Sequence, residues 1–137
     1  IKMAFNSKVN AMIIPVSADL DGSVGDDFTF KVNHPMVIHR FEFIVQTAVV
    51  ATSTDPVVSL DYTDTVNSVS RAEKVTLTVP NTTAAGVTIE ASLTPFFVAD
   101  TDILHFERKT QGAGGSTAGD GYYLVYYELI PDGNGVA

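Results

Sequence analysis

The chain has 137 residues and no cysteine, so it has the size of one domain that can bury a core without disulfides. The missing cysteines also exclude thiolate metal sites and cysteine nucleophiles. Sixteen acidic residues against eight basic ones give a net charge of −8, which repels phosphate backbones, so we expect no nucleic-acid partner. No stretch approaches the roughly 18 apolar residues of a membrane span, and we expect no membrane partner.

The amino-terminal stretch IKMAFNSKVNAMIIPVS, residues 1–17, mixes apolar side chains with two lysines and is the only basic-leaning part of the chain. We expect an arm and the start of the first strand over residues 1–14, followed by a single β-sandwich domain over residues 15–137. The side chains expected to lie on a partner are Lys2, Phe5, Lys8, Met12 and Ile13. The alternative is an ordinary edge strand, where Pro15 is tolerated because no ladder donor is needed there.

Four aspartates crowd the stretch DLDGSVGDD, residues 19–27: Asp19, Asp21, Asp26 and Asp27. Clustered carboxylates suit calcium, but the glycine comes too early for a calcium loop and the closing glutamate is missing. We therefore interpret the stretch as an acidic turn between the first two strands. The sequence predicts no metal and no cofactor.

Alternation of apolar and polar residues, the pattern of half-buried strands, runs through the middle of the chain. Within residues 40–47 it places Phe41, Phe43 and Val45 on one face. Residues 74–80 and 87–93 alternate in the same way and predict either a hairpin or a crossing between two sheets. Residues 64–74 are predicted to form either a helical turn or a loop. Further strands are expected over residues 10–17, 27–33, 57–62, 102–109 and 121–130.

The stretch TQGAGGSTAGDG, residues 110–121, contains five glycines. A phosphate-binding loop needs a helix after its glycines, whereas a strand is expected here, and dinucleotide spacing requires a glycine where Thr117 stands. We expect a long hairpin loop that joins the strands at 102–109 and 121–130. It is either a plain surface loop or a loop ordered against a neighbouring subunit, with contacts expected at Gly112, Gly114, Gly115 and Thr117.

The strand at 121–130 has two apolar faces, because alternation sends Tyr122, Leu124 and Tyr126 one way and Tyr123 and Val125 the other. Such a strand is either covered on both sides or lines the core with one face and a subunit interface with the other. In the second case we expect Tyr122 and Tyr126 to contact the partner.

No catalytic constellation is visible in the sequence. His34, His39 and His105 form no His-x-His pair on one strand face, and no serine stands in a Gly-x-Ser-x-Gly elbow. The sequence therefore predicts a protein that is not an enzyme.

The strand count and the Gly, Pro, Asn and Asp clusters between strands predict an all-β protein, an antiparallel β-sandwich of about eight strands. Residues 96–130 carry an aromatic pair, a short acidic turn, an apolar strand, a Gly/Thr-rich loop and an alternating strand. This pattern resembles the closing strands of tailed-bacteriophage capsid decoration (cement) proteins and, more loosely, of phage receptor-binding knobs.

The resemblance implies a jelly roll and a virion structural protein on the outer capsid surface. Such a protein sits at a symmetry axis, often as a homotrimer, and binds the major capsid protein at capsomer junctions, which stabilises the capsid. The alternative function is a receptor-binding or tail-tip knob that recognises a host glycan or protein.

Overall fold

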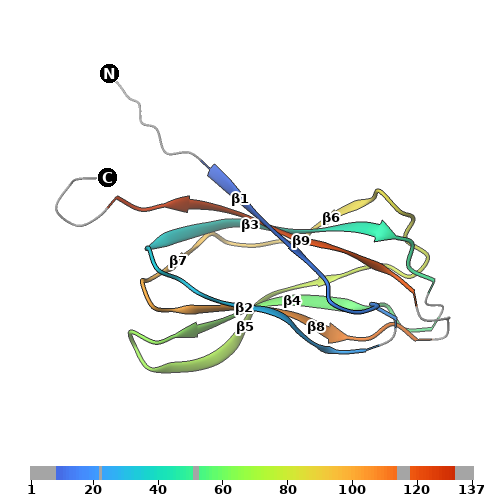
Figure 1. Ribbon diagram of the computed structural model, residues 1–137, viewed down its shortest axis with the longest axis horizontal. Coiled ribbons are helices and arrows are strands. Elements are labelled where there is room, and N and C mark those ends of the chain that lie inside the picture. The colour runs from blue at the N-terminus through green and yellow to red at the C-terminus, as the bar shows by residue number, and fades with distance from the viewer. Residues whose placement is uncertain (1–8, 22, 51–52, 114–117, 132–137) are drawn as a thin grey trace, which may run out of the picture.

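The structure, a computed structural model, describes residues 9–21, 23–50, 53–113 and 118–131. These residues form two antiparallel sheets that lie face to face (Figure 1). Sheet A contains β1 (Val9–Pro15), β9 (Asp120–Leu129), β3 (Met36–Thr47), β6 (Thr88–Glu90) and β7 (Phe96–Val98). Sheet B contains, in spatial order, β2 (Gly25–Lys31), β8 (Ile103–Thr110), β4 (Val57–Asp64) and β5 (Val69–Thr78).

The predicted all-β antiparallel sandwich is confirmed, with one more strand than the eight expected. The extra strand arises because the edge of sheet A beside β3 is interrupted. β6 pairs with the stretch Glu42–Ile44 of β3, and β7 pairs with Met36–Ile38. The segment between β6 and β7 contains Pro95, which lacks the N–H that a continuous ladder needs.

The core fills the space between the sheets with the inward-facing residues of both. Phe41, Phe43 and Val45 are fully buried, as the alternation in residues 40–47 predicts. Phe106 of sheet B meets Tyr123 of sheet A edge to face, with 5.5 Å between the ring centroids. Contacts of this kind lock the two sheets together through aromatic packing.

Strands pair from the two ends of the chain inward: β1 pairs with β9, β2 with β8, β3 with β6 and β7, and β4 with β5.

Two of the sequence expectations concern the connections between strands. The runs at 74–80 and 87–93 lie in different sheets, so the predicted crossing is confirmed and the hairpin is not. The predicted hairpin between 102–109 and 121–130 is wrong, because β8 belongs to sheet B and β9 to sheet A. The glycine-rich stretch therefore crosses between the sheets.

The structure has a turn at residues 65–68, as the loop alternative for residues 64–74 predicts, and a strand from Val69 onward, which neither alternative predicts. This strand, β5, runs along β4. The first six residues of β5 are all exposed, so no apolar alternation marks this part of the strand. Its extended form comes from pairing with β4 in a hairpin, in which Asp64 lies opposite Val69 and Tyr62 opposite Ala72.

Two glycines of the crossing at 111–119 and the start of β9 have structural roles. Gly119 has a φ of +87° and packs against Leu20 and Val49. At Gly121, an added Cβ would lie 2.0 Å from the carbonyl oxygen of Ile44. Only glycine therefore allows β9 to approach β3 at this point.

Candidate interaction surface

The outer face of sheet A carries an apolar surface built from β1 and β9. Register places Ala11 opposite Tyr126 and Ile13 opposite Leu124, so side chains of both strands lie together on that face. We call this surface the tyrosine face; its residues are Val9, Ala11, Ile13, Tyr122, Leu124 and Tyr126. Val9 is 58% exposed and Ile13 is 62% exposed. The described residues form only the two layers of the sandwich, and none packs over this face.

The two faces of β9 have different environments. Tyr123 and Val125 point into the core and are fully buried. Tyr122 and Tyr126 lie half-buried on the outer face, with Leu124 nearly buried between the neighbouring strands. The strand thus lines the core with one side, as the second sequence alternative requires, and leaves an apolar surface on the other. Contact of that surface with a partner stays a prediction.

A polar rim flanks the tyrosine face along β3. The Arg40 guanidinium lies 5.1 Å from the centroid of the Tyr126 ring, a cation–π distance. Its Nε lies 3.1 Å from the carboxylate of Glu90, and it also donates to Glu42, which is buried although alternation points it outward. An apolar centre with a charged rim is the anatomy of a protein–protein interface.

The outer face of sheet B has the opposite character, because it carries a cross-strand network of charges around Arg71. The guanidinium lies 2.7 Å from Asp26, 2.8 Å from Asp61 and 3.4 Å from Glu107. The hydrogen bond from Arg71 lowers the pKa of Asp26. Burial, together with the charge of Asp61, raises the pKa of Glu107. The charges of this network are satisfied within the chain.

A second cluster of polar groups is buried at the β2 end of the sandwich around Asp27. The Asp27 carboxylate accepts hydrogen bonds from the Ser17 backbone N–H at 2.9 Å, from the Ser17 hydroxyl at 2.7 Å and from Arg108 Nε at 2.8 Å. The Tyr123 hydroxyl donates to its second oxygen. Burial and the neighbouring Asp27 raise the pKa of Tyr123, which keeps the phenol protonated. This cluster ties the β1–β2 connection to both sheets.

Three of the four aspartates at residues 19–27 accept hydrogen bonds within the chain. Asp26 and Asp27 belong to β2 and are paired with arginines, whereas Asp19 is exposed in the connection. Asp21 accepts the Val50 N–H at 3.2 Å. Within the described ranges, no group of three or more His, Cys, Asp or Glu side chains could hold a metal ion.

The three histidines do not converge. Nε2 of His34 lies 2.8 Å from the Ile130 carbonyl oxygen, Nε2 of His39 lies 3.0 Å from Glu128, and Nε2 of His105 lies 2.9 Å from the Thr63 hydroxyl. Burial and the positive charge of Arg71 lower the pKa of His105. Each histidine thus contacts a different residue in a different part of the structure.

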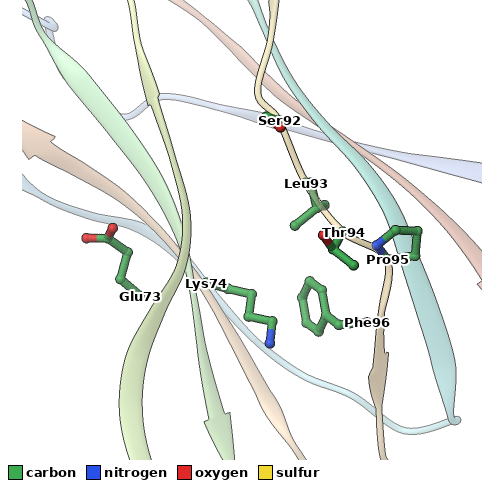
Figure 2. Close-up of a pocket in the computed structure, with 7 residues that line it drawn as sticks. All are labelled: Glu73, Lys74, Ser92, Leu93, Thr94, Pro95 and Phe96. Atoms are coloured by element: carbon green, nitrogen blue, oxygen red, sulfur yellow. The ribbon is translucent and has the colours of Figure 1, made fainter.

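A cavity of about 420 Å³ opens between β5 and the segment that joins β6 to β7; the residues that line it are Glu73, Lys74, Ser92, Leu93, Thr94, Pro95 and Phe96. Figure 2 shows Lys74 and Phe96 pointing toward one another, with Glu73 turned away. The Lys74 ammonium lies 4.7 Å from the centroid of the Phe96 ring, and Glu73 pairs with Lys109 at 2.7 Å. No sequence pattern predicts this cavity, because it forms between β5 and residues 92–96, which pack together only in the folded chain.

The remaining predicted contact residues divide into two groups. Met12 packs against the core from the inner face of β1, and Gly112 is buried with its N–H donating to the Leu20 carbonyl at 2.9 Å, so their contacts lie within the chain. Residues 9–14 of the expected arm form part of β1. The other predicted contacts lie outside the described residues: Lys2, Phe5, Lys8, Gly114, Gly115 and Thr117.

No family model matches the chain, and comparison with curated proteins finds no match either. In the described part of the chain, no helix is long and apolar enough to cross a membrane.

Proposed function

We propose that the protein is a non-catalytic virion structural protein that decorates a phage capsid and stabilises it by binding the major capsid protein at capsomer junctions. The observation that carries this proposal is the tyrosine face. An apolar surface with exposed Val9 and Ile13, two half-buried tyrosines and a charged rim is suited to a protein partner. The proposal includes a homo-oligomer; the family resemblance implies a trimer, whereas the uncharged edge of β1 favours a two-fold pair.

The strand order supports the jelly-roll part of the proposal. If β6 and β7 are taken as one interrupted strand, the first strand pairs with the last, the second with the next to last, and so on inward to β4 and β5. A chain that winds this way makes two Greek keys, the arrangement of the jelly rolls found in viral capsid and lectin domains.

The proposed mechanism is mass action. A ligand that binds only the assembled shell stabilises it by RT ln(1 + [L]/Kd), which is about 2.7 kcal/mol per site at 100 times the Kd. The sandwich needs no conformational change for this role. Its charged outer face on sheet B, where Arg71 and the carboxylates around it are paired, remains available to solvent.

The test measures cosedimentation with shells assembled from the major capsid protein encoded in the same genome. The variants Tyr122→Ala and Tyr126→Ala are expected to weaken binding at least about tenfold, because buried tyrosines at an interface are frequent energetic anchors. The matched control is Thr76→Ala, an exposed strand position on sheet B, which is expected to bind like the wild type. Shell binding that is absent, or that both tyrosine variants retain in full, would contradict the proposal.

The receptor-binding alternative would rely on the cavity beside Phe96. Its hydroxyls, Ser92 and Thr94, are suited to a glycan, but the Lys74 ammonium already lies over the aromatic ring on which a sugar would stack. This contact disfavours a glycan in the cavity, and the cosedimentation test distinguishes a host protein from the capsid as the partner of the tyrosine face.

A further inference from the structure

The outer edge of β1 differs from every other sheet edge in the described structure. β2 carries Asp26, Asp27 and Lys31, and β5 carries Arg71, Glu73 and Lys74. β6 and β7 are three residues each. Charged side chains and short length are the usual means by which proteins prevent edge strands from pairing with other chains. β1 is seven residues long and has no charged residue, and its proline, Pro15, is its last residue, so the edge from Val9 to Ile14 lacks these protections.

The hydrogen-bond pattern of β1 shows which backbone groups this edge offers. The Val16 N–H donates to the Gly121 carbonyl at 3.0 Å, directly after the uninterrupted register of β1 with β9. Because consecutive residues of a strand direct their backbone groups to opposite sides, Val9, Ala11 and Ile13 direct theirs away from β9. Pro15 falls in the same set, so its missing N–H costs β1 no bond to β9.

We propose that β1 pairs with β1 of a second copy of this chain, antiparallel about a two-fold axis beside Ala11. This register places Ala11 opposite Ala11 and Val9 opposite Ile13 of the other copy. Each of the three residues then donates and accepts one bond, and Pro15 is not required as a donor. The register centred on Met12 is less favourable, because it sets the Val9 carbonyl opposite Pro15.

Self-complementarity is the reason that the occupant is a second copy, and charge decides where the two copies meet. Two copies with a net charge of −8 each repel one another, so they approach best where their facing surfaces carry no charge. β1 itself carries no charge, and the charged groups beside it already have partners: Glu128, opposite Val9, contacts His39, and Arg40, over the Tyr126 ring, contacts Glu90. An antiparallel pair of identical strands is also self-complementary about a two-fold axis. The pairing sets exposed Val9 beside exposed Ile13 of the other copy and joins the two tyrosine faces.

The first experiment uses a single introduced thiol, because the chain has no cysteine of its own. In the proposed register the two Ala11 Cα atoms are about 5.5 Å apart, which is within the range of a disulfide. Ala11→Cys is therefore expected to form a covalent dimer on mild oxidation. Ile13→Cys should not, because its two copies are offset by four residues, about 14 Å. Thr76→Cys, on the charged β5 edge, is the control for random collision.

The second experiment is sedimentation equilibrium of the full chain over a range of concentrations. We expect the wild type to approach twice the chain mass and Ala11→Pro to return it to the chain mass. The fold should be kept, because the Ala11 N–H does not bond β9, which circular dichroism checks. A wild type that is monomeric or trimeric, or Ala11→Cys that cross-links no faster than Thr76→Cys, overturns the proposal. None of these results decides capsid binding, which the tyrosine variants test separately.

Discussion

Replacement of Asp27 by alanine is expected to be one of the most damaging single changes in this protein. The Asp27 side chain is fully buried, and Arg108, its ion-pair partner at 2.8 Å, is 6% exposed. The substitution leaves the guanidinium without its counter-ion and removes the acceptor for Ser17 and the Tyr123 hydroxyl. Breaking a buried pair by removing one partner costs roughly 3–5 kcal/mol, a large part of the 5–15 kcal/mol by which a typical domain is stable.

Urea denaturation followed by tyrosine fluorescence measures this loss. With an m value of about 2 kcal/mol/M, a cost of about 4 kcal/mol lowers the midpoint by about 2 M. Tyr123→Phe removes a single donor, while Asp27 keeps its bonds from Ser17 and Arg108, so we expect a loss of only about 1 kcal/mol.

The double variant Asp27→Leu with Arg108→Met separates the ion pair from simple packing. Because it removes both charges together, we expect it to be clearly more stable than Asp27→Ala, and the Tyr123 hydroxyl left without its acceptor keeps it below the wild type. A double variant as unstable as Asp27→Ala would show that the buried charge left behind is not the cause. A cost for Asp27→Ala no larger than that of Tyr123→Phe would contradict the same reasoning.

Three further predictions follow from the structure. Gly121→Ala should lower the free energy of unfolding by roughly 3 kcal/mol, measured by thermal unfolding, because the added Cβ meets the Ile44 carbonyl oxygen. Gly86→Ala should lower it by only about 1 kcal/mol, because Gly86 has a φ of +90° but nothing near the added Cβ. For Asp102, burial alone would raise the pKa, but hydrogen bonds from Tyr62, Ala99 and Thr65 outweigh it and lower the pKa. The ionised Asp102 carboxylate therefore stabilises the fold above its unfolded pKa, and this stability is lost as the pH falls through the folded pKa. Asp102→Asn should be less stable than the wild type at pH 7, and its free energy of unfolding should change less between pH 5 and pH 2. Unfolding curves with the same acid dependence as the wild type would contradict this prediction. For Glu107, the raised pKa means that its negative charge opposes folding at neutral pH. Glu107→Gln should therefore be at least as stable as the wild type at pH 7, and the difference should disappear at lower pH, where Glu107 of the wild type is protonated. A Glu107→Gln variant that is clearly less stable than the wild type at pH 7 would contradict this prediction.

Several parts of the candidate surface follow from alternation alone. The two-residue period assigned Tyr122 and Tyr126 to the face opposite Tyr123, and the structure buries Tyr123 while leaving the other two on the outer face. The same period predicted the burial of Phe41 and Phe43. Side-chain direction along a strand is a property of the local backbone, so the sequence is sufficient to assign it.

Other parts of the surface depend on register. The sequence singled out Ile13 for its apolar character. Its position opposite Leu124 depends on the alignment of β1 with β9, and the position of Arg40 over Tyr126 depends on the alignment of β3 with β9. The lack of charge on β1 acquires meaning only once β1 is known to lie at an edge. Residues 114–117 and 1–8, which held most of the other expected contacts, lie outside the described residues.

By itself, the sequence determined the fold class, the approximate positions of most strands and the face on which their apolar side chains lie. Only the tertiary structure decided that β8 pairs with β2 and β4 in place of β9, and that residues 69–74 extend a strand with no apolar pattern. It also decided that Arg71 and Arg108 pair with Asp26 and Asp27 of the acidic stretch. The physical reason is that alternation is encoded residue by residue. The choice of partner strand depends on burying apolar faces and pairing charges between segments that, as for β1 and β9, lie more than 100 residues apart.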